Sequence, residues 1–247
     1  LPVQEMVRYS FIATDYGIHT NTAGVVYFEQ YMINANESDI ALTNEIITGL
    51  EKREFDVYYQ PKFDLTQKKF IGAEALIRWN HPTRGLLFPS SFILFAEKTD
   101  LITKIDRYMF DRVCEDIAYW KSKGYRLMTV SINLSRRGLY LPDLIPFMKA
   151  TLEKHKTNPL LIEIELTEST TSKDILFVVS MIKQLKDLKL HVSIDDFGTG
   201  YSSLSYLKKI PFDVMKIDKS FFDDIEVDKK ARDVVKALID LAKALDI

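Results

Sequence analysis

The sequence contains almost no cysteine. Cys114 is its only thiol, so no disulfide can form within the chain, and a lone thiol in a globular protein is usually a buried packing residue. We therefore expect an inert Cys114 and a reducing, cytoplasmic compartment. The sequence also lacks any apolar run near the roughly 18 residues that cross a bilayer. We expect no membrane contact by this chain, which leaves open whether a longer parent protein is attached to a membrane.

Two further absences narrow the classes of ligand. The formal net charge is −2, which gives no overall attraction to nucleic acid or anionic lipid, so we expect no DNA or RNA partner. The chain has 4 histidines, and none is spaced from another histidine or from Cys114 as zinc ligands are. The sequence thus argues against a zinc-type cluster, and His191 is interpreted as a structural residue.

What the sequence has instead is an alternation of strand-like and helix-like segments. The expected strands cover 55–63, 70–79, 128–134, 161–166, 191–195 and 212–217, and the expected helices cover 91–123, 142–156, 173–186, 202–209 and 229–244. Ahead of them we expect a helix over 3–16, turns over 17–24, a short strand over 25–28, a polar link over 34–39 and a helix over 40–52. Strands that alternate with helices indicate βα units on a parallel sheet.

The pattern within those strands distinguishes a barrel from an open sheet. In 161–166 the apolar Ile162 and Ile164 alternate with Glu163 and Glu165, and the strands at 128–134, 191–195 and 212–217 show the same split. Strands buried on both faces of a doubly wound sheet read as continuous apolar runs, so a polar lumen inside a ring of helices fits better. The expected fold class is α/β, a TIM-like (β/α) barrel with its functional groups at the carboxyl ends of the strands.

Oxygen-bearing side chains from four expected strands gather at that edge: Glu74, Asn133, Glu165, Asp195 and Asp196. Carboxylate and amide oxygens suit Mg²⁺ or Mn²⁺, and the adjacent Asp195 and Asp196 need a cation or hydrogen bonds to offset their repulsion. Lys216, on the next strand, faces the same lumen. Two metals with a lysine that polarises water form an arrangement for phosphodiester hydrolysis.

Simpler interpretations stay open for several side chains. Glu163, deeper in its strand, is assigned to a structural ion-pair network, and Arg78 is either a counter-ion of the lumen carboxylates or a clamp for phosphate. The aromatic pairs at 58–59 and 221–222 are interpreted as core rather than as stacking platforms. Gly198 and Gly200 either allow a sharp, movable turn after the aspartates or simply connect a strand to a helix.

Seven ordered motifs resemble those of the EAL-domain cyclic di-GMP phosphodiesterases. They are "YYQP" (58–61), "GAEALIRWNHP" (72–82), "FPSSFILFAE" (88–97), "SINLS" (131–135), "EIELTES" (163–169), "DDFGTGYSSL" (195–204) and "PFDVMKIDKSF" (211–221). The family takes its name from Glu74-Ala75-Leu76 in the second motif. The resemblance implies hydrolysis of cyclic di-GMP to linear pGpG in bacterial second-messenger signalling, with two Mg²⁺ or Mn²⁺ ions as cofactors.

The resemblance also implies roles for individual residues. Glu74, Asn133, Glu165 and Asp195 match the family's first metal site, and Asp195 with Asp196 matches the second. Lys216 matches the lysine that orients the attacking water, and Glu168 matches the glutamate that holds the loop after the double aspartate. Gln60, Leu76 and Arg78 match residues near the bound dinucleotide.

The expected domain organisation follows from the same resemblance. Residues 1–34 resemble the C-terminal tail of a GGDEF-like (diguanylate cyclase-like) domain without its signature loop, and residues 35–247 resemble an EAL barrel with an antiparallel first strand. The family continues with two more strands, so we expect a barrel truncated before them, with its own activity in question. A binding-only cyclic di-GMP receptor and a dimerisation module are the alternatives to an enzyme. The family also implies a homodimer.

Overall fold

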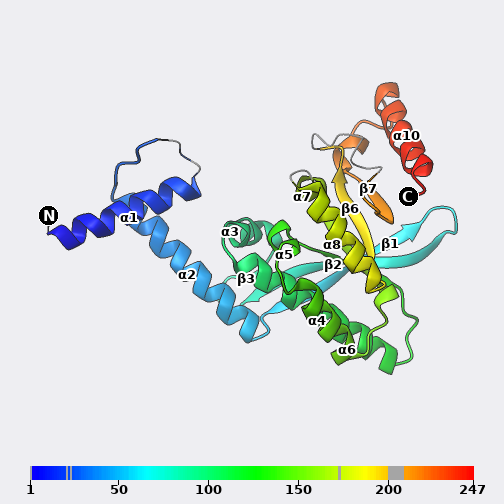
Figure 1. Cartoon of the computed structure of the whole chain (residues 1–247), viewed down its shortest axis with the longest axis horizontal. Helices are drawn as coiled ribbons and strands as arrows, with labels where there is room; N and C mark the ends of the chain where they lie inside the picture. Colours follow the sequence, from blue (N-terminus) through cyan, green and yellow to red (C-terminus); the bar gives the residue numbers. More distant parts are fainter. Residues whose placement is uncertain (1, 21, 23, 172–173, 200–208) are drawn as a thin grey trace. The chain divides into compact units, whose positions relative to one another are not determined.

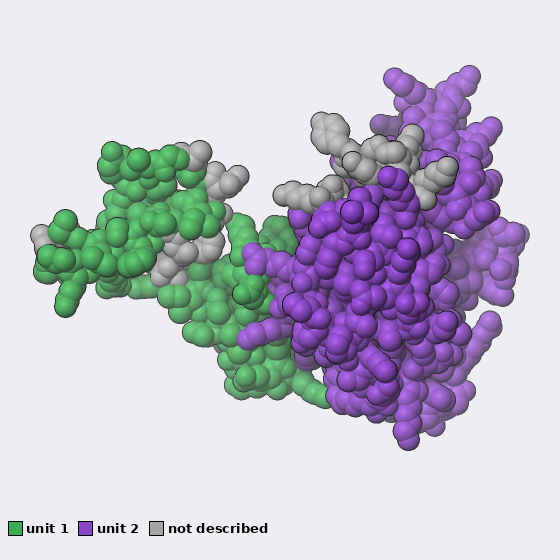
Figure 2. Space-filling view, in the orientation of Figure 1, with its two compact units in different colours: residues 1–56, 79–101 green, residues 57–78, 102–247 purple. Residues whose placement is uncertain are grey.

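A computed structural model of the chain describes residues 2–20, 22, 24–171, 174–199 and 209–247. The chain divides into two compact units (Figure 2): unit 1 contains residues 1–56 and 79–101, and unit 2 contains residues 57–78 and 102–247. No helix within the described ranges is long and apolar enough to cross a membrane. Gly200 and the expected helix over 202–209, except its last residue, fall outside the described residues.

Unit 1 begins with two helices, α1 (Val3–His19) and α2 (Tyr31–Glu51). Ile12, Ala13 and Met32 form a buried cluster between them, and Val26 and Phe28 of the connecting segment pack against this cluster. The two helices are thus held together by a small apolar core of their own.

Three expectations about this region are wrong. The first helix continues beyond the expected end at residue 16 to His19, and residues 25–28 form no strand. A strand needs a hydrogen-bonded neighbouring strand, whereas this segment packs on helices. The expected polar link over 34–39 is helical, because α2 begins at Tyr31 and places Met32 in the cluster. Glu37 and Ser38 of that segment lie on the exposed side of α2.

The rest of unit 1 is built around stacked rings. Phe55 and Trp79 stack with their centroids 4.7 Å apart, and Phe92 meets both rings edge-on. All three rings are buried, and the indole nitrogen of Trp79 donates to Glu54 at 3.1 Å. This unit also contains β3 (Gly85–Leu87), η1 (Pro89–Ser91) and α3 (Ile93–Lys98), with β3 paired antiparallel to the end of β2.

Unit 2 contains most of the sheet, whose strands follow the order β1-β2-β4-β5-β6-β7 (Figure 1). These are β1 (Phe55–Asp64), β2 (Lys69–His81), β4 (Thr129–Asn133), β5 (Ile162–Thr167), β6 (His191–Phe197) and β7 (Val214–Ile217); β1 and β2 each extend by a few residues into unit 1. The strands from β2 to β7 in this order are parallel. Residues 65–68 alone connect β1 to β2, which is too short for a parallel crossover, so β1 is antiparallel.

Helices follow most of the parallel strands. They are α4 (Leu101–Ser122), α5 (Arg136–Leu139), α6 (Leu144–His155), η2 (Pro159–Leu161), α7 (Glu168–Thr171), α8 (Ile175–Asp187), η3 (Lys219–Phe222) and α10 (Lys229–Ala244). Helix α8 packs beside β6 (Figure 1). The short elements α5, α7 and η3 each begin within three residues after a strand, and these strand ends are where the site is built.

The alternation expected from the sequence is confirmed. Ile162, Ile164 and Leu166 are fully buried on one face of β5, whereas Glu163 and Glu165 alternate with them on the other face and are 7 % and 1 % exposed. The described chain therefore has the expected α/β fold with a mostly parallel, TIM-like sheet. The last strand begins at Val214, two residues later than expected.

Candidate metal centre

The expected acidic residues converge at the carboxyl ends of the strands in unit 2. Glu74 lies near the end of the part of β2 that pairs with β4, opposite Ser131. Asn133 at the end of β4 lies opposite Glu165 of β5. Asp195 lies in the last part of β6. Since parallel strands end at one edge of a sheet, residues distant in the sequence meet there. The strand-end rule thus predicted this group correctly.

Glu74, Glu165 and Asp195 form one compact carboxylate cluster. One oxygen of each lies within 4.8 Å of the others, and the Lys216 ammonium of β7 is bound by all three. Its Nζ lies 2.7 Å from Glu165 Oε2, 2.8 Å from Asp195 Oδ2 and 3.1 Å from Glu74 Oε2. The three carboxylates therefore surround a single cationic position.

This arrangement changes the proton affinity of its members. Burial alone would raise the pKa of Glu165, but hydrogen bonding and charge from Lys216, with the charge of Lys62, hold that pKa below its usual value. Burial alone would lower the pKa of Lys216, yet its hydrogen bonds to Asp195 and Glu165 raise it. Lys216 is therefore a cation and Glu165 an anion at neutral pH.

A second lysine binds the same glutamate and was not predicted. Lys62 of β1 donates to Glu165 Oε1 at 3.0 Å and to Glu163 Oε1 at 3.1 Å. The interpretation of Glu163 as part of an ion-pair network is thus confirmed. Gln60, two residues before Lys62, was expected near the bound dinucleotide, and the two-residue period of a strand places Lys62 on the same face. That period was the signal that could have found it.

Asn133 holds Glu74 in place. Its Nδ2 donates to Glu74 Oε1 at 3.0 Å, so Glu74 keeps Oε2 directed at Lys216. Asn133 itself is exposed. The amide therefore lies next to the carboxylate cluster, as the sequence predicted, and orients one of its members.

A β-bulge places the two adjacent aspartates. Ile194 pairs with Met215 and Phe197 pairs with Ile217, so β6 has one residue more than β7 between these pairs. Asp196 has a φ of 53°, in the left-handed region, and its backbone N–H donates to Asp195 Oδ1 at 2.9 Å. Bulges re-aim side chains near functional sites. Burial and then the charge of Asp195 raise the pKa of Asp196.

Two neighbours constrain the turn after the aspartates: the Glu168 carboxylate and the Phe221 ring. The backbone N–H of Gly198 donates to Glu168 Oε2 at 2.7 Å, which is the contact expected for Glu168, a residue only 3 % exposed. Gly198 has a φ of +101°, and a Cβ there would lie 2.5 Å from the Phe221 ring. Glycine is therefore required at this position for both its conformation and its small size.

The three residues expected near a dinucleotide lie on neighbouring strands. Leu76 and Arg78 are half-buried on β2, and Gln60 is exposed on β1. The Arg78 guanidinium lies 5.5 Å above the ring of Tyr58 and donates to the Ile77 carbonyl at 2.8 Å.

The core interpretation of the pair at 58–59 is wrong for one of its members. Tyr58 is 47 % exposed, whereas Tyr59 is partly buried and donates to Asp116 at 2.6 Å. Of the second pair, Phe222 is 40 % exposed, so the core interpretation fails there too. On β1, alternate residues face opposite sides, so Tyr59 can pack while Tyr58 stays exposed, whereas Phe222 lies at the end of η3.

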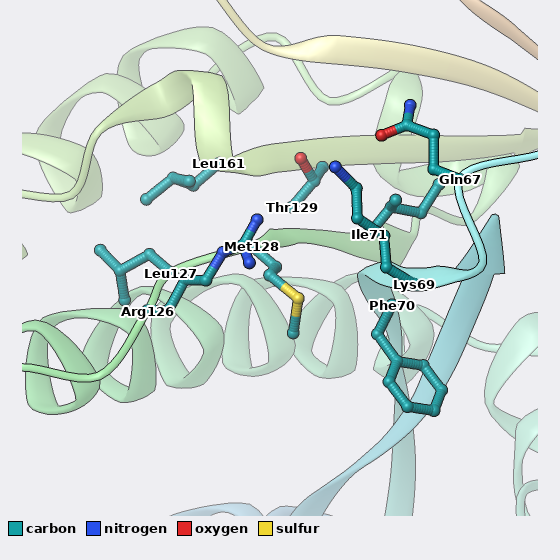
Figure 3. Close-up of a pocket in the computed structure, with 9 residues that line it drawn as sticks. All are labelled: Gln67, Lys69, Phe70, Ile71, Arg126, Leu127, Met128, Thr129 and Leu161. Carbon is teal, nitrogen blue, oxygen red and sulfur yellow. The ribbon is translucent and has the colours of Figure 1, made fainter.

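A pocket of about 300 Å³ lies elsewhere in unit 2 (Figure 3). Lys69 at the start of β2, Thr129 at the start of β4 and Leu161 just before β5 are among its lining residues. It therefore lies at the amino ends of the parallel strands, opposite the carboxylate cluster. None of the residues predicted to bind metal or substrate lines it.

The donor set fits a divalent metal. All its expected members offer oxygen, which Mg²⁺ and Mn²⁺ prefer. The position bounded by Glu74, Glu165 and Asp195 already holds the cationic group of Lys216, so it is built for positive charge. The cluster is therefore suited to hold a metal ion by chemistry and by charge.

Comparison with known proteins identifies relatives of this chain. Residues 43–247 match the sequence model of the EAL domain family. The signaling protein YkoW of Bacillus subtilis is 41 % identical over 86 % of the chain, and the bifunctional diguanylate cyclase/cyclic di-GMP phosphodiesterase MucR of Pseudomonas aeruginosa is 35 % identical over 91 %. The matched region is 27 % of the length of the first relative and 33 % of the second.

A solved structure supports the same relationship. The structure described as the PaMucR phosphodiesterase in complex with c-di-GMP superimposes with a TM-score of 0.78 and is 35 % identical in sequence. The superposition covers 84 % of each chain. The match to the EAL domain over residues 43–247 includes the strands that carry the carboxylate cluster.

Proposed function

The chain belongs to the EAL domain family, and we propose that it is a metal-dependent phosphodiesterase that opens cyclic di-GMP to linear pGpG in bacterial signalling. The similarity to the MucR phosphodiesterase, whose structure holds c-di-GMP, supports this substrate. The matched region is about a third or less of the curated relatives' length. The activities of those longer proteins are therefore assigned to this chain only as a proposal.

The single observation that carries the proposal is the compact cluster of Glu74, Glu165 and Asp195 around Lys216. A structural ion pair would need only one or two carboxylates per lysine. Three carboxylates at one strand-end position are a costly concentration of charge, which a binding site for cations explains.

We assign the metal ligands as follows. Glu74, Asn133, Glu165 and Asp195 hold a first Mg²⁺ or Mn²⁺, and Asp195 with Asp196 contributes to a second. The hydrogen bond from Asn133 Nδ2 to Glu74 Oε1 supports the first assignment. The charges of Asp195, Lys216 and Glu74 act on the Asp196 carboxyl, which supports the second. When bound, a divalent metal lowers the pKa of water and stabilises charge that develops on phosphate.

The chain's own residues supply position and charge. Lys216, a cation at neutral pH because of its carboxylate partners, donates hydrogen bonds that can hold a water oxygen beside the phosphorus. Arg78 offers a guanidinium to a phosphate oxygen, for which its donor geometry is suited; Leu76 and Gln60 face the nucleotide. Glu168 fixes the turn after the aspartates through Gly198. Water adds to one phosphorus, one ring P–O bond breaks, and the leaving oxygen takes up a proton.

The proposal extends to organisation and setting. Residues 35–247 are assigned to the EAL domain and residues 1–34 to the tail of a GGDEF-like domain, in keeping with a match that begins at residue 43. We also propose a cytoplasmic location and a homodimer. Sedimentation of the chain at several concentrations tests the last point, and a single monomeric species throughout would refute it.

Turnover of cyclic di-GMP is the direct test. The chain is incubated with the dinucleotide and Mg²⁺ or Mn²⁺, and the product is separated by chromatography. We expect pGpG from the wild type and from Asp233→Ala, a matched change of an exposed α10 carboxylate, and none from Asp195→Ala. Binding of cyclic di-GMP without any pGpG would refute the enzyme and leave a receptor. Neither binding nor turnover would leave a dimerisation module.

A further inference from the structure

Lys62 joins two glutamates of one strand. It lies on β1, outside the parallel strands, and its ammonium lies 3.1 Å from Glu163 Oε1 and 3.0 Å from Glu165 Oε1. The two glutamates are separated by one residue of β5 and therefore face the same side of the sheet. The side chains of Glu163 and Glu165 are 9 % and 0 % exposed, so little water competes for these oxygens.

The two carboxylate oxygens of Glu165 accept hydrogen bonds from different lysines. Oε1 accepts from Lys62, whereas Oε2 accepts from Lys216 at 2.7 Å. Oε2 is the oxygen that belongs to the cationic position shared with Glu74 and Asp195. A metal ion that takes this position can reach Oε2 directly, while Oε1 stays engaged by Lys62.

We propose that Lys62 is a positioning residue that limits Glu165 to one ligand oxygen and keeps Glu163 out of the metal site, so that the site prefers the small ions Mg²⁺ and Mn²⁺ to Ca²⁺. This inference rests on the proposed metal dependence of the cluster. It concerns a residue that touches the ligand rather than the reacting atoms.

The coordination chemistry of the ions gives the reason. Ca²⁺ takes six to eight oxygens and readily accepts both oxygens of one carboxylate, whereas Mg²⁺ requires near-octahedral geometry with single oxygens. Without Lys62, Glu165 could turn to offer both of its oxygens, and the Glu163 carboxylate would be released. Both changes enlarge the ligand set and favour the larger ion.

A ratio of affinities separates this effect from simple charge. Removing a positive charge near the cluster strengthens the binding of every divalent ion by Coulomb attraction, and a general loss of structure weakens all of them. Both effects largely cancel in the ratio of Ca²⁺ affinity to Mg²⁺ affinity. A change in the number of available oxygens does not cancel.

The experiment measures that ratio by competition. Free Mn²⁺ is followed by its electron paramagnetic resonance signal in the presence of the full chain, and bound Mn²⁺ is displaced by Mg²⁺ or by Ca²⁺. The variants are Lys62→Met, Lys62→Gln and Lys62→Arg, together with Lys69→Met as a matched loss of an exposed lysine from the next strand. Thermal unfolding identifies folded variants, and Lys62→Gln is used if Lys62→Met does not fold.

We expect the ratio of Ca²⁺ to Mg²⁺ affinity to rise about tenfold or more in Lys62→Met and Lys62→Gln. Lys62→Arg retains donors for both glutamates and should keep the wild-type ratio, as should Lys69→Met. An unchanged ratio in the neutral variants, an equal change in Lys69→Met, or no rescue by arginine would overturn the inference.

The same samples separate this inference from the proposed function. Wild-type chain that binds Mn²⁺ with a Lys62-dependent ratio but makes no pGpG would sink the enzyme and leave the role of Lys62 intact. Production of pGpG with a Ca²⁺ to Mg²⁺ affinity ratio independent of Lys62 would support the enzyme and refute the role of Lys62. Absence of any Mn²⁺ binding by the wild type would overturn both.

Discussion

The ammonium nitrogen of Lys216 lies 2.7 Å from Oε2 of Glu165, a carboxylate whose side chain has no exposed surface. The same nitrogen contacts Glu74 and Asp195. The lysine therefore neutralises part of the cluster, and it occupies the position that the three carboxylates would offer to a metal ion. A lysine with this position both competes with a metal and lies next to the proposed reaction.

Replacement of Lys216 should separate metal binding from turnover. Lys216→Met removes the competing cation, so we expect Mn²⁺ affinity to rise about tenfold, equivalent to roughly 1.4 kcal/mol. The rate of pGpG formation should fall by about 10² or more, as when one preorganised donor is removed from an active site. Titration with Mn²⁺, followed by electron paramagnetic resonance, measures the affinity, and chromatography of pGpG measures the rate. Lys219→Met, on the exposed surface of η3, should alter neither, and weaker Mn²⁺ binding by Lys216→Met would contradict the competition.

Loss of the Glu168 carboxylate should slow turnover without direct contact to metal. Glu168→Ala leaves the Gly198 N–H without its 2.7 Å acceptor and lets the turn after Asp196 shift, so we expect pGpG formation to fall about 10²-fold, as for a small misplacement of catalytic groups. Glu168→Gln keeps an acceptor and should lose less. Initial rates at saturating cyclic di-GMP provide the measurement. Glu153→Ala, an exposed change on α6, is the control. Equal rates for wild type and Glu168→Ala would show that the Glu168 contact with Gly198 does not position the catalytic groups.

Gly198 should tolerate alanine less well than a glycine with only a conformational demand. Gly198→Ala combines a positive φ with a Cβ 2.5 Å from Phe221, whereas Gly124, with a φ of +74°, has nothing within 4 Å of its added Cβ. The expected loss in free energy of unfolding is about 1 kcal/mol for Gly124→Ala. It should be larger by about 1 kcal/mol or more for Gly198→Ala. Urea denaturation measures both, and equal losses would mean that the ring moves away freely.

Cys114 should be unreactive in the folded chain. Burial raises the pKa of its thiol to about 12, so at pH 8 only about one thiol in 10⁴ is ionised, and the thiolate is the reactive form. A chromogenic disulfide reagent should therefore react slowly with native protein at pH 8 and rapidly after unfolding in urea. Because the pKa of the thiol is raised, the native rate should still increase above about pH 9, where the rate of an ordinary thiol levels off. Rapid labelling of the native chain at pH 8 would show that the side chain is accessible.

The sheet could be predicted because its strands obey one local rule. Alternation of Ile162 and Ile164 with Glu163 and Glu165 reports a strand with two different faces, and this pattern needs no knowledge of the neighbours. The N-terminal region had no such signal. Glu37 and Ser38 resemble a linker by composition, yet they lie on the exposed side of α2, and contacts of Met32 with α1 decide that this segment is helical.

The carboxylate cluster could be predicted for a similar reason, since parallel strands deliver their last residues to one edge. Lys62 escaped this rule because β1 runs in the opposite direction and Lys62 lies near its end, so the rule assigns it to the other edge. Its long side chain nevertheless reaches Glu165. The bulge at Asp196 also could not be predicted, because a positive φ is uncommon even for aspartate, which adopts it more often than most residues.

The extra residue in β6 changes which face of the strand the following side chains occupy. Strict alternation would place Asp196 on the apolar side with Ile194 and would turn Phe197 towards the polar lumen. The bulge returns Phe197 to register with Ile217, where it is buried, and leaves Asp195 and Asp196 side by side near the carboxyl end of β6. Changes of length should therefore do more harm here than changes of identity. Deleting a single residue from 195–196 would rephase the end of the strand and expel either an acid from the site or an aromatic ring from the core.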